Sequence, residues 1–208
     1  MAVIWIILFL DHRRRWPQDV HLGEANMENG RTLANPAPLG LAAFGITAFL
    51  VTSGDANLFN QAGYAAFMPL ALYYGGIVSI LVSIMEFFRG DAIGVAFFGT
   101  FGAFWLALWY LNSHPQEQES NGTFGVFFLG FAAAAFIFWM AVMKRSMLHN
   151  LFGLLLTLTL ATEAFGKWAG HASVVKAGGW IGVLTSLVAL YMAAKVLINE
   201  EHGKVLLP

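Results

Sequence analysis

The sequence predicts an all-α integral membrane protein with six transmembrane helices. Of its 208 residues, 58% are hydrophobic and only 11% are charged, whereas a soluble domain carries about 25% charged residues. So few charges cannot cover a surface that faces water. Six apolar stretches also approach the length of about 20 residues that a helix needs to cross a bilayer.

Short polar connections separate the predicted spans. The first span is the shortest, and Pro36 and Pro38 mark its start, where a proline costs no hydrogen bond. Asn35 directly precedes them and is of a type that caps helix starts, and Pro69 marks the first turn of the second span. The predicted spans are Pro38–Thr52, Phe67–Phe88, Ala92–Leu111, Gly122–Met143, Leu148–Gly166 and Ala177–Ile198. The predicted connections are Ser53–Ala66, Arg89–Asp91, Asn112–Asn121, Lys144–Met147 and Lys167–Lys176.

Positive residues are divided unevenly between the two ends of the predicted spans. If the N-terminus is inside, the inner side holds Arg31, Arg89, Lys144, Arg145, Lys195 and Lys204. The outer side then holds only Lys167 and Lys176. Because cytoplasmic loops carry the excess of lysine and arginine, we expect a multi-pass protein of the cytoplasmic membrane, surrounded by lipid, with both termini in the cytoplasm.

Residues 1–32 are predicted to be an N-terminal extension that precedes a six-helix domain at 33–208. Met1–Leu10 is apolar but too short to span a bilayer, and three arginines follow it. A signal peptide has its positive charge before the apolar run. The extension is therefore either an interfacial helix, a disordered tail, or a segment that is not authentic, with Met27 as the true start.

A weak internal repeat relates the predicted spans. Gly40–Gly45 in the first span resembles Gly94–Gly99 in the third, and the second and sixth spans each contain a Gly-Gly pair. The second, fourth and sixth spans also end near a basic residue. The repeat predicts three helical hairpins around one axis, with the first, third and fifth spans in equivalent positions around a pathway.

Two acidic residues lie within the predicted spans, where ionisable groups are expensive and usually functional. Glu163 lies one helical turn before Lys167, and Glu86 lies one turn before Arg89. Each glutamate is therefore a candidate proton-linked carboxylate. The alternative is an ion pair at the membrane interface, because both pairs lie near the ends of their spans.

The sequence has no pattern typical of catalysis or of a cofactor site. It has no cysteine, and no two of its six histidines have the i, i+4 spacing of a helical zinc site. It also lacks a phosphate-binding glycine loop and a nucleophile elbow. Its net charge of −1 gives no basic footprint for nucleic acid. We therefore expect no enzyme, catalytic residue, metal, cofactor or nucleic-acid partner.

The most specific motif lies at the start of the first span. It reads Asn35-Pro36-Ala37-Pro38-Leu39-Gly40-Leu41 and is followed by Phe44, Gly45 and Thr47. The two prolines leave the N–H groups of the next residues at the positive end of the helix, where a carboxylate is stabilised. From the residues alone, the motif is either a capped helix start or an anion site.

This motif resembles the signature of the acetate uptake transporter family, best known from bacterial succinate–acetate permeases. Further segments resemble the family in the same order: Tyr74–Ile77, Gly99–Trp105, Gly179–Gly182 and Asn199–Pro208. The resemblance extends from about Leu33 to Pro208. It implies a homohexamer with a separate pathway in each protomer, and uptake of acetate, in some members of succinate, often with protons.

The resemblance also implies a narrow hydrophobic constriction made by side chains of the first, third and fifth spans. These positions fall at Phe44, Phe101 and Leu156. Bacterial members often have tyrosine at the second position, so Phe101 removes a hydroxyl from the constriction. An ionised carboxylate loses its hydration at such a ring at a high cost, and apolar rings also gate by dewetting.

Hydroxyl groups lie next to the predicted constriction. Thr47 is one turn beyond Phe44, and Thr100 and Thr157 adjoin the other two positions. They either contact the substrate, with Thr47 the first candidate, or bond to carbonyl groups of their own helices. Two rivals to a carboxylate transporter are a channel for another small solute, such as ammonium/ammonia or formate, and a membrane scaffold that transports nothing.

Overall fold

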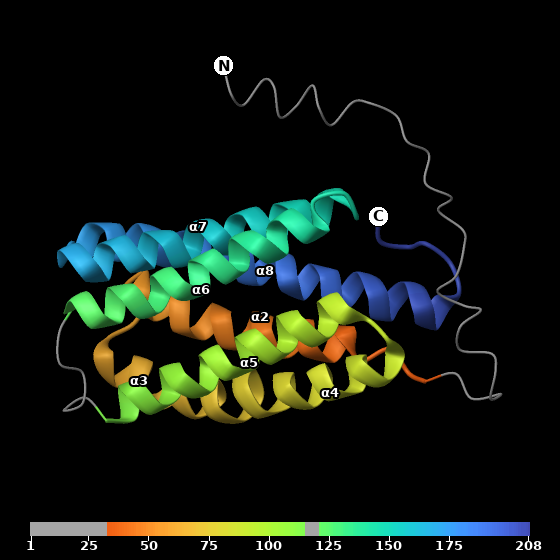
Figure 1. Ribbon diagram of the computed structural model, residues 1–208, viewed down its shortest axis with the longest axis horizontal. Coiled ribbons are helices and arrows are strands. Elements are labelled where there is room, and N and C mark those ends of the chain that lie inside the picture. Colours follow the sequence, from red (N-terminus) through yellow and green to blue (C-terminus); the bar gives the residue numbers. More distant parts are fainter. Residues whose placement is uncertain (1–32, 115–120) are drawn as a thin grey trace, which may run out of the picture. The chain divides into compact units, whose positions relative to one another are not determined.

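Six long apolar helices run side by side in the computed structural model, which describes residues 33–114 and 121–208 (Figure 1). The helical segments are α2 (Ala37–Asp55), α3 (Gln61–Leu70), η1 (Ala71–Val78), α4 (Ser79–Arg89), α5 (Ala92–Ser113), α6 (Asn121–Val142), α7 (Met147–Ala169) and α8 (Ala172–His202). The second span consists of three consecutive segments, α3, η1 and α4. The predicted all-α fold with six spans is confirmed, whereas the predicted extension at 1–32 lies outside the described residues.

Local sequence explains where the helices begin and end. Asp91 caps α5, because its carboxylate accepts hydrogen bonds from the N–H groups of Ile93 and Gly94, both at 3.1 Å. The hydroxyl of Ser146 caps α7 in the same manner. Gly90 and Gly170 follow α4 and α7 with φ of 75° and 68°, a left-handed conformation that glycine adopts without a steric penalty.

Two predictions about connections were wrong. The segment Lys167–Lys176 is not a loop, because α7 continues to Ala169 and α8 begins at Ala172. Lys167 remains helical because carboxylates inside the bundle compensate its charge. Helix α3, which leads into the second span, begins at Gln61 within the predicted connection Ser53–Ala66, so Pro69 lies inside α3 and not in a first turn. The span itself, Phe67–Arg89, agrees with the predicted Phe67–Phe88.

A π-helical segment, η1, follows Pro69 directly and occupies the middle of the second span. Proline lacks an N–H group and so interrupts the regular ladder of hydrogen bonds, and π-helical turns are found mostly at single sites within α-helices. Gly75 and Gly76 of η1 are buried against neighbouring helices. Nothing in the sequence analysis indicated this segment.

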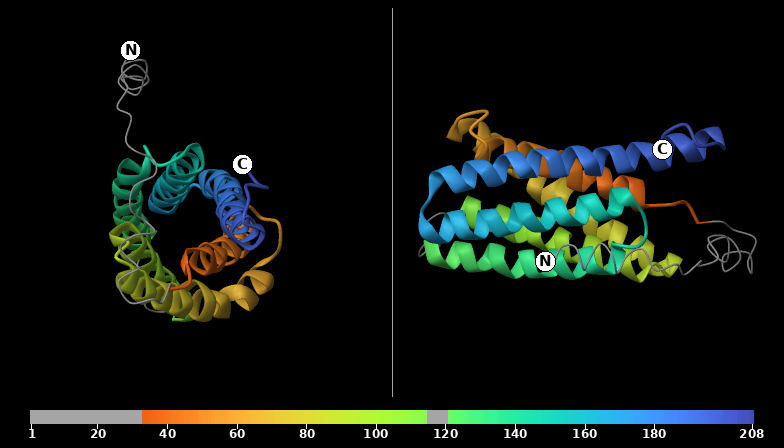
Figure 2. Two further views of the ribbon diagram at one scale, coloured as in Figure 1. Left: turned by 90° about the vertical axis from the view of Figure 1, so that its right-hand side faces the viewer. Right: turned by 90° about the horizontal axis from the view of Figure 1, so that it is seen from above.

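The helices follow one another around a ring when residues 35–208 are seen end-on (Figure 2). Helix α2 packs along α8, α8 along α7, and α7 along α6, while α5 packs along η1 and α4, and η1 returns to α2. The contact between α2 and α8 joins the first and last spans and closes the ring. The backbones of α5 and α6 come close at few positions, and aromatic rings pack between them. The ring centroids of Phe104 and Phe131 are 4.9 Å apart, and those of Phe97 and Phe138 are 5.8 Å apart.

We expect Gly179→Ala to lower the stability of the folded bundle by about 1–3 kcal/mol, the usual cost of overpacking. A Cβ atom there would meet the backbone nitrogen of Ala56 and lie 2.8 Å from the carbonyl oxygen of Thr52. Gly130→Ala is the matched control, because no atom of a neighbouring element lies within 4 Å of its added Cβ. Thermal unfolding in detergent measures both variants, and equal midpoints would contradict the close packing of α2 on α8.

Candidate functional site

A cluster of aromatic side chains fills the middle of the bundle. The ring centroid of Phe44 on α2 lies 5.7 Å from those of Phe97 and Phe101 on α5 and Phe152 on α7, and 5.9 Å from that of Trp105. Edge-to-face geometry of this kind adds to the stabilisation from burial alone. We call these five residues the aromatic cluster. Its rings come from three helices, so it fixes how α2, α5 and α7 stand relative to one another.

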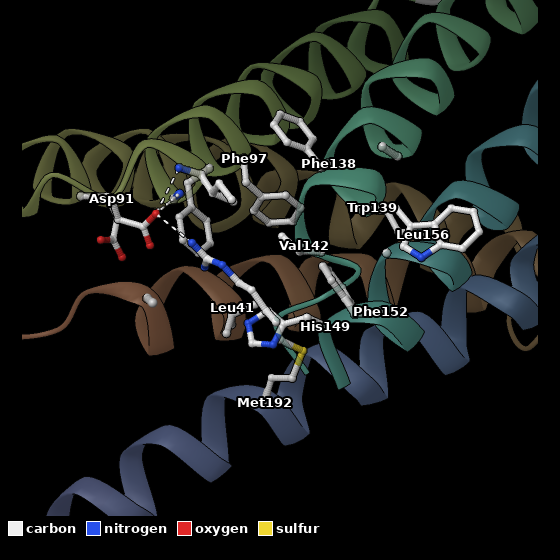
Figure 3. A pocket seen from close by; sticks show the side chains of 18 residues that line it. Leu41, Asp91, Phe97, Phe138, Trp139, Val142, His149, Phe152, Leu156 and Met192 are labelled. Atoms are coloured by element: carbon white, nitrogen blue, oxygen red, sulfur yellow. Dashed lines mark hydrogen bonds and ion pairs between the residues drawn. The ribbon is translucent and has the colours of Figure 1, made fainter. Parts of the chain in front are cut away.

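Two cavities lie on either side of the aromatic cluster. The larger, the Glu86 cavity, has a volume of about 100 Å³ and is lined by Leu41, Phe97, Phe138 and Phe152 (Figure 3). Glu86 also lines it. The smaller, the Glu163 cavity, has a volume of about 40 Å³. It is lined by Phe44, Phe101, Trp105, Thr159, Thr185 and Glu163. Each cavity is large enough for water or a small solute.

The structure brings together the three residues of the expected constriction. Phe44 and Phe101 belong to the aromatic cluster, and Leu156 lines both cavities. All three side chains are buried. Phe97 and Phe152, which complete the separation between the cavities, were not singled out in the sequence, where they are two of 19 phenylalanines.

The proline-rich start of α2 is engaged with the rest of the protein. Asn35 precedes the N-cap residue Pro36, and its side-chain oxygen accepts a hydrogen bond from the Ala37 N–H at 3.1 Å. The same oxygen accepts a bond from Arg89 at 2.8 Å, and the amide group donates to Glu200 at 3.0 Å. The side chain of Asn35 therefore ties the start of α2 to the ends of α4 and α8.

The other residues of the motif have different surroundings. Pro36, Pro38 and Gly40 are buried, and Gly40 lies directly against the ring of Phe98. Leu39 is 46% exposed on the outer surface. Leu41 lines the Glu86 cavity.

Thr47 lies beside the aromatic cluster with an unused hydroxyl group. Its side chain is fully buried, and it packs with Trp105 against Gly75 of η1, where a Cβ would come within 2.8 Å of both. Within the described part of the chain, neither the Thr47 hydroxyl nor the Trp105 indole N–H has a hydrogen-bond partner. Unpartnered polar groups in a bundle interior are uncommon. Trp105 lines the Glu163 cavity, whereas Thr47 lines neither cavity.

The other predicted threonines are placed less favourably. Thr157 donates to the carbonyl group of Gly153 on its own helix at 2.8 Å, and Thr100 lines neither cavity. Thr159 does line the Glu163 cavity, where its hydroxyl lies 3.0 Å from that of Thr185.

Ion pairs occupy the end of the bundle near the Glu86 cavity. Glu86 is fully buried and lies 3.1 Å from Arg89, as the spacing predicted. Asp91 lies 3.6 Å from Arg145, and both of these residues line the cavity. Two carboxylates here face two guanidinium groups, so these pairs are balanced in charge.

A second ionic cluster occupies the opposite end. Lys167 Nζ lies 3.2 Å from Glu163, the predicted pair, and 3.7 Å from Asp55 at the end of α2. The ammonium group also lies 5.5 Å and 5.2 Å from the ring centroids of Phe124 and Phe128. The sequence analysis missed Asp55 because it ended the first span at Thr52. Among the described residues, no group of three or more His, Cys, Asp or Glu could hold a metal ion.

These features define a multi-pass membrane protein in which an aromatic cluster separates two interior cavities and ionic groups lie at both ends. The chain belongs to the GPR1/FUN34/yaaH family, whose family model matches residues 21–208. The membership confirms the resemblance found in the sequence.

Individual relatives extend this finding. The chain is 31% identical over 180 residues to the succinate-acetate/proton symporter SatP of Escherichia coli K12. The aligned region covers 85% of this chain and 95% of that protein. The solved structure of the bacterial acetate channel SatP matches with a TM-score of 0.81 at 29% identity, over 85% of this chain and 99% of the other. The ammonia transport outward protein 2 of Saccharomyces cerevisiae is 27% identical over 83% of this chain and 64% of its own length.

We expect Asp91→Ala to lower stability by about 1 kcal/mol, because it removes the cap of α5. Asp91→Asn keeps an oxygen that accepts from Ile93 and Gly94, so its loss should be much smaller. Both variants lose the partly exposed ion pair with Arg145, which contributes less than about 1 kcal/mol. Unfolding in detergent compares them, and equal losses would show that the cap contributes nothing.

Proposed function

We propose that this protein transports acetate and other small carboxylates, succinate included, across the membrane. The observation that carries the proposal is the meeting of Phe44, Phe101 and Leu156 between two cavities, in a fold that matches the SatP acetate channel. Residues 33–208 act as one transporter domain. Of the pathway residues expected from the sequence, we propose those that line a cavity or adjoin the aromatic cluster, namely Leu41, Phe44, Thr47, Phe101 and Leu156.

The aromatic cluster acts as the constriction of the pathway. The rings of Phe44 and Phe101 offer only hydrocarbon to a passing carboxylate, which has to shed water at a cost of several kcal/mol. The buried hydroxyl of Thr47 and the indole N–H of Trp105 are unpartnered donors beside these rings. They supply hydrogen bonds to the carboxylate where hydration is lost, so that the methyl group of acetate meets the rings.

A cationic side chain lies at each end of the pathway, beside carboxylates. Arg145 lines the Glu86 cavity and lies 3.6 Å from Asp91, and Lys167 lies next to the Glu163 cavity. Each can donate a charge-assisted hydrogen bond to a carboxylate that enters. From the bias of lysine and arginine in the sequence, we assign both termini and the Glu86 cavity to the cytoplasmic side.

Transport is linked to protons, and the two buried glutamates are the groups proposed for it. Glu163 and Glu86 each line one cavity and are buried within the membrane-spanning part of the bundle. Ionisable residues in such positions commonly belong to proton or ion pathways.

Six protomers associate into a homohexamer with one pathway in each protomer. Large apolar side chains on the outer surface are available for contacts with lipid and with neighbouring protomers. They include Tyr73, Leu81, Phe88 and Ile137. Native mass spectrometry from mild detergent should give six copies of the chain. A monomer under all mild conditions would contradict this assembly.

Transport is tested by uptake of labelled acetate into proteoliposomes, with the flux into empty liposomes subtracted. We expect a protein-dependent flux that succinate reduces by competition. Excess ammonium should leave the flux unchanged. A flux equal to that of empty liposomes would reject the proposal, and competition by ammonium alone would favour the ammonia-transport alternative suggested by the yeast relative.

Phe44→Ala is expected to raise acetate flux at least severalfold and to weaken the discrimination between acetate and succinate, because it removes the central ring of the cluster. Loss of a buried phenylalanine also costs about 3–5 kcal/mol of stability, so correctly folded protein has to be confirmed by gel filtration. Phe88→Ala serves as control, since that ring is exposed and contacts only Phe87 among the described aromatic rings. Unchanged fluxes for Phe44→Ala would count against the constriction.

A further inference from the structure

We infer that Asp55, Lys167 and Glu163 form a carboxylate- and proton-binding site at the outer end of the Glu163 cavity. An incoming carboxylate pairs with Lys167, and Glu163 takes up one proton as its own ion pair with Lys167 breaks. The inference deepens the proposed transport function, on which it rests, and assigns one proton to each carboxylate bound.

The three side chains meet from two helices that are far apart in the sequence. Lys167 and Glu163 are one turn apart on α7, and Asp55 ends α2. The ammonium nitrogen lies 3.2 Å from Glu163 Oε2 and 3.7 Å from Asp55 Oδ1. Their side-chain exposures are 18% for Lys167, 14% for Asp55 and 2% for Glu163. The side chains of Lys167 and Asp55 are thus partly accessible, whereas Glu163 is almost fully buried.

Charge is not balanced in this group. Two carboxylates share one ammonium group, so the fully ionised site has a charge of −1 in surroundings made by the rings of Phe124 and Phe128. The four ionic groups near the Glu86 cavity sum to zero in the same ionised state. An uncompensated charge away from water is costly, so the surplus makes this end the natural place for a proton.

A carboxylate that enters would raise the charge of the group from −1 to −2 if no proton followed. Proton uptake by Glu163 restores −1 and frees Lys167 to face the substrate. The proton is released by a hydronium ion at the cavity mouth, whose O–H bond breaks and leaves water as the O–H bond on the glutamate forms. Reversal of these events on departure of the carboxylate returns the proton.

Few charged groups surround Glu163. Helix α2 contributes Asp55 and α7 contributes Lys167, and within the described residues no further charged group acts on the glutamate. Helix α6 contributes aromatic rings. Helix α8 contributes Gly178, whose added Cβ would lie 2.7 Å from Oε1, and the hydroxyl of Thr185 farther along the cavity.

Glu163 is assigned the proton in preference to Asp55 for two reasons. It is the more deeply buried of the two carboxylates. Its Oε1 atom also lacks a hydrogen-bond partner within the part of the chain that the structure describes, although it lines the cavity. An unpartnered acceptor gains most from a proton, because the new O–H group is a donor that the substrate or a water can accept.

The decisive experiment counts protons on binding. The full-length protein in weakly buffered detergent solution at pH 7 is mixed with sodium acetate at the same pH, and a pH-indicating dye records proton uptake. We expect about one proton per acetate bound by the original protein, by charge balance. We expect close to none for Glu163→Gln, which keeps size and polarity but cannot take up a proton.

Two further variants complete the test: one replaces Glu163→Gln if that variant does not fold, and the other is a control. Asp55→Asn leaves one carboxylate for one ammonium group, so it should also abolish proton uptake if Glu163→Gln does not fold. Glu201→Gln is the control, because it replaces an exposed glutamate on α8 that lines neither cavity, and it should retain about one proton per acetate. Proton uptake by Glu163→Gln, or its loss in Glu201→Gln, would overturn the inference.

Uptake into proteoliposomes separates this inference from the proposed function. With the membrane potential held at zero by potassium and valinomycin, lowering the outer pH by one unit should raise the protein-dependent initial rate by up to about tenfold. Glu163→Gln should conduct acetate with little dependence on outer pH. Flux that is independent of pH in the original protein would reject the proton site and leave transport standing, whereas absence of flux would reject transport itself.

Discussion

The packing of α2 against α8 is the contact on which the rest of the structure depends. It closes the ring of helices by joining the first span to the last, and small residues make it close: Gly45 on α2 lies against Ser186 and Leu190, and Gly179 lies against the end of α2. In lipid, helices associate mainly through such close backbone contacts. With α2 held there, Phe44 meets the rings of α5 and α7.

The same contact brings both ends of α2 to their ionic partners. At one end, Asn35 reaches Glu200 of α8 and Arg89 of α4. At the other, Asp55 reaches Lys167 of α7. Asn35 thus precedes α2 at one end, Phe44 of the aromatic cluster lies within it, and Asp55, which pairs with Lys167, ends it. The interior of the bundle between its ends is left to aromatic rings and hydroxyl groups.

Much of the fold could be predicted from the sequence because lipid imposes a simple rule on it. Apolar runs long enough to span a bilayer gave the number of helices, and Glu163 with Lys167 could be paired from one turn of spacing. Boundaries were less accurate, as at Pro69 and Lys167. At Pro69 the helix begins earlier, at Gln61, and at Lys167 two carboxylates pair with the ammonium group where a polar loop was expected.

The candidate site could be predicted only in part. Phe44 and Phe101 follow from motifs that resemble a family, whereas the places of Phe97 and Phe152 depend on how α5 and α7 are rotated against α2. Asp55 was missed for a related reason. Its partner lies on a helix more than a hundred residues later in the chain, and no local pattern records such a meeting.

The proposed constriction has a consequence for discrimination between solutes. The rings of Phe44, Phe97, Phe101 and Phe152 carry no hydroxyl, so they offer no hydrogen bond to the oxygen atoms of an acid. In this proposal the four rings select solutes by size and by how readily each loses its water, and polar recognition falls to the Trp105 indole, the Thr47 hydroxyl and the two cavities. A change of one of those polar side chains would then alter the substrate preference while the four phenylalanine rings stay in place.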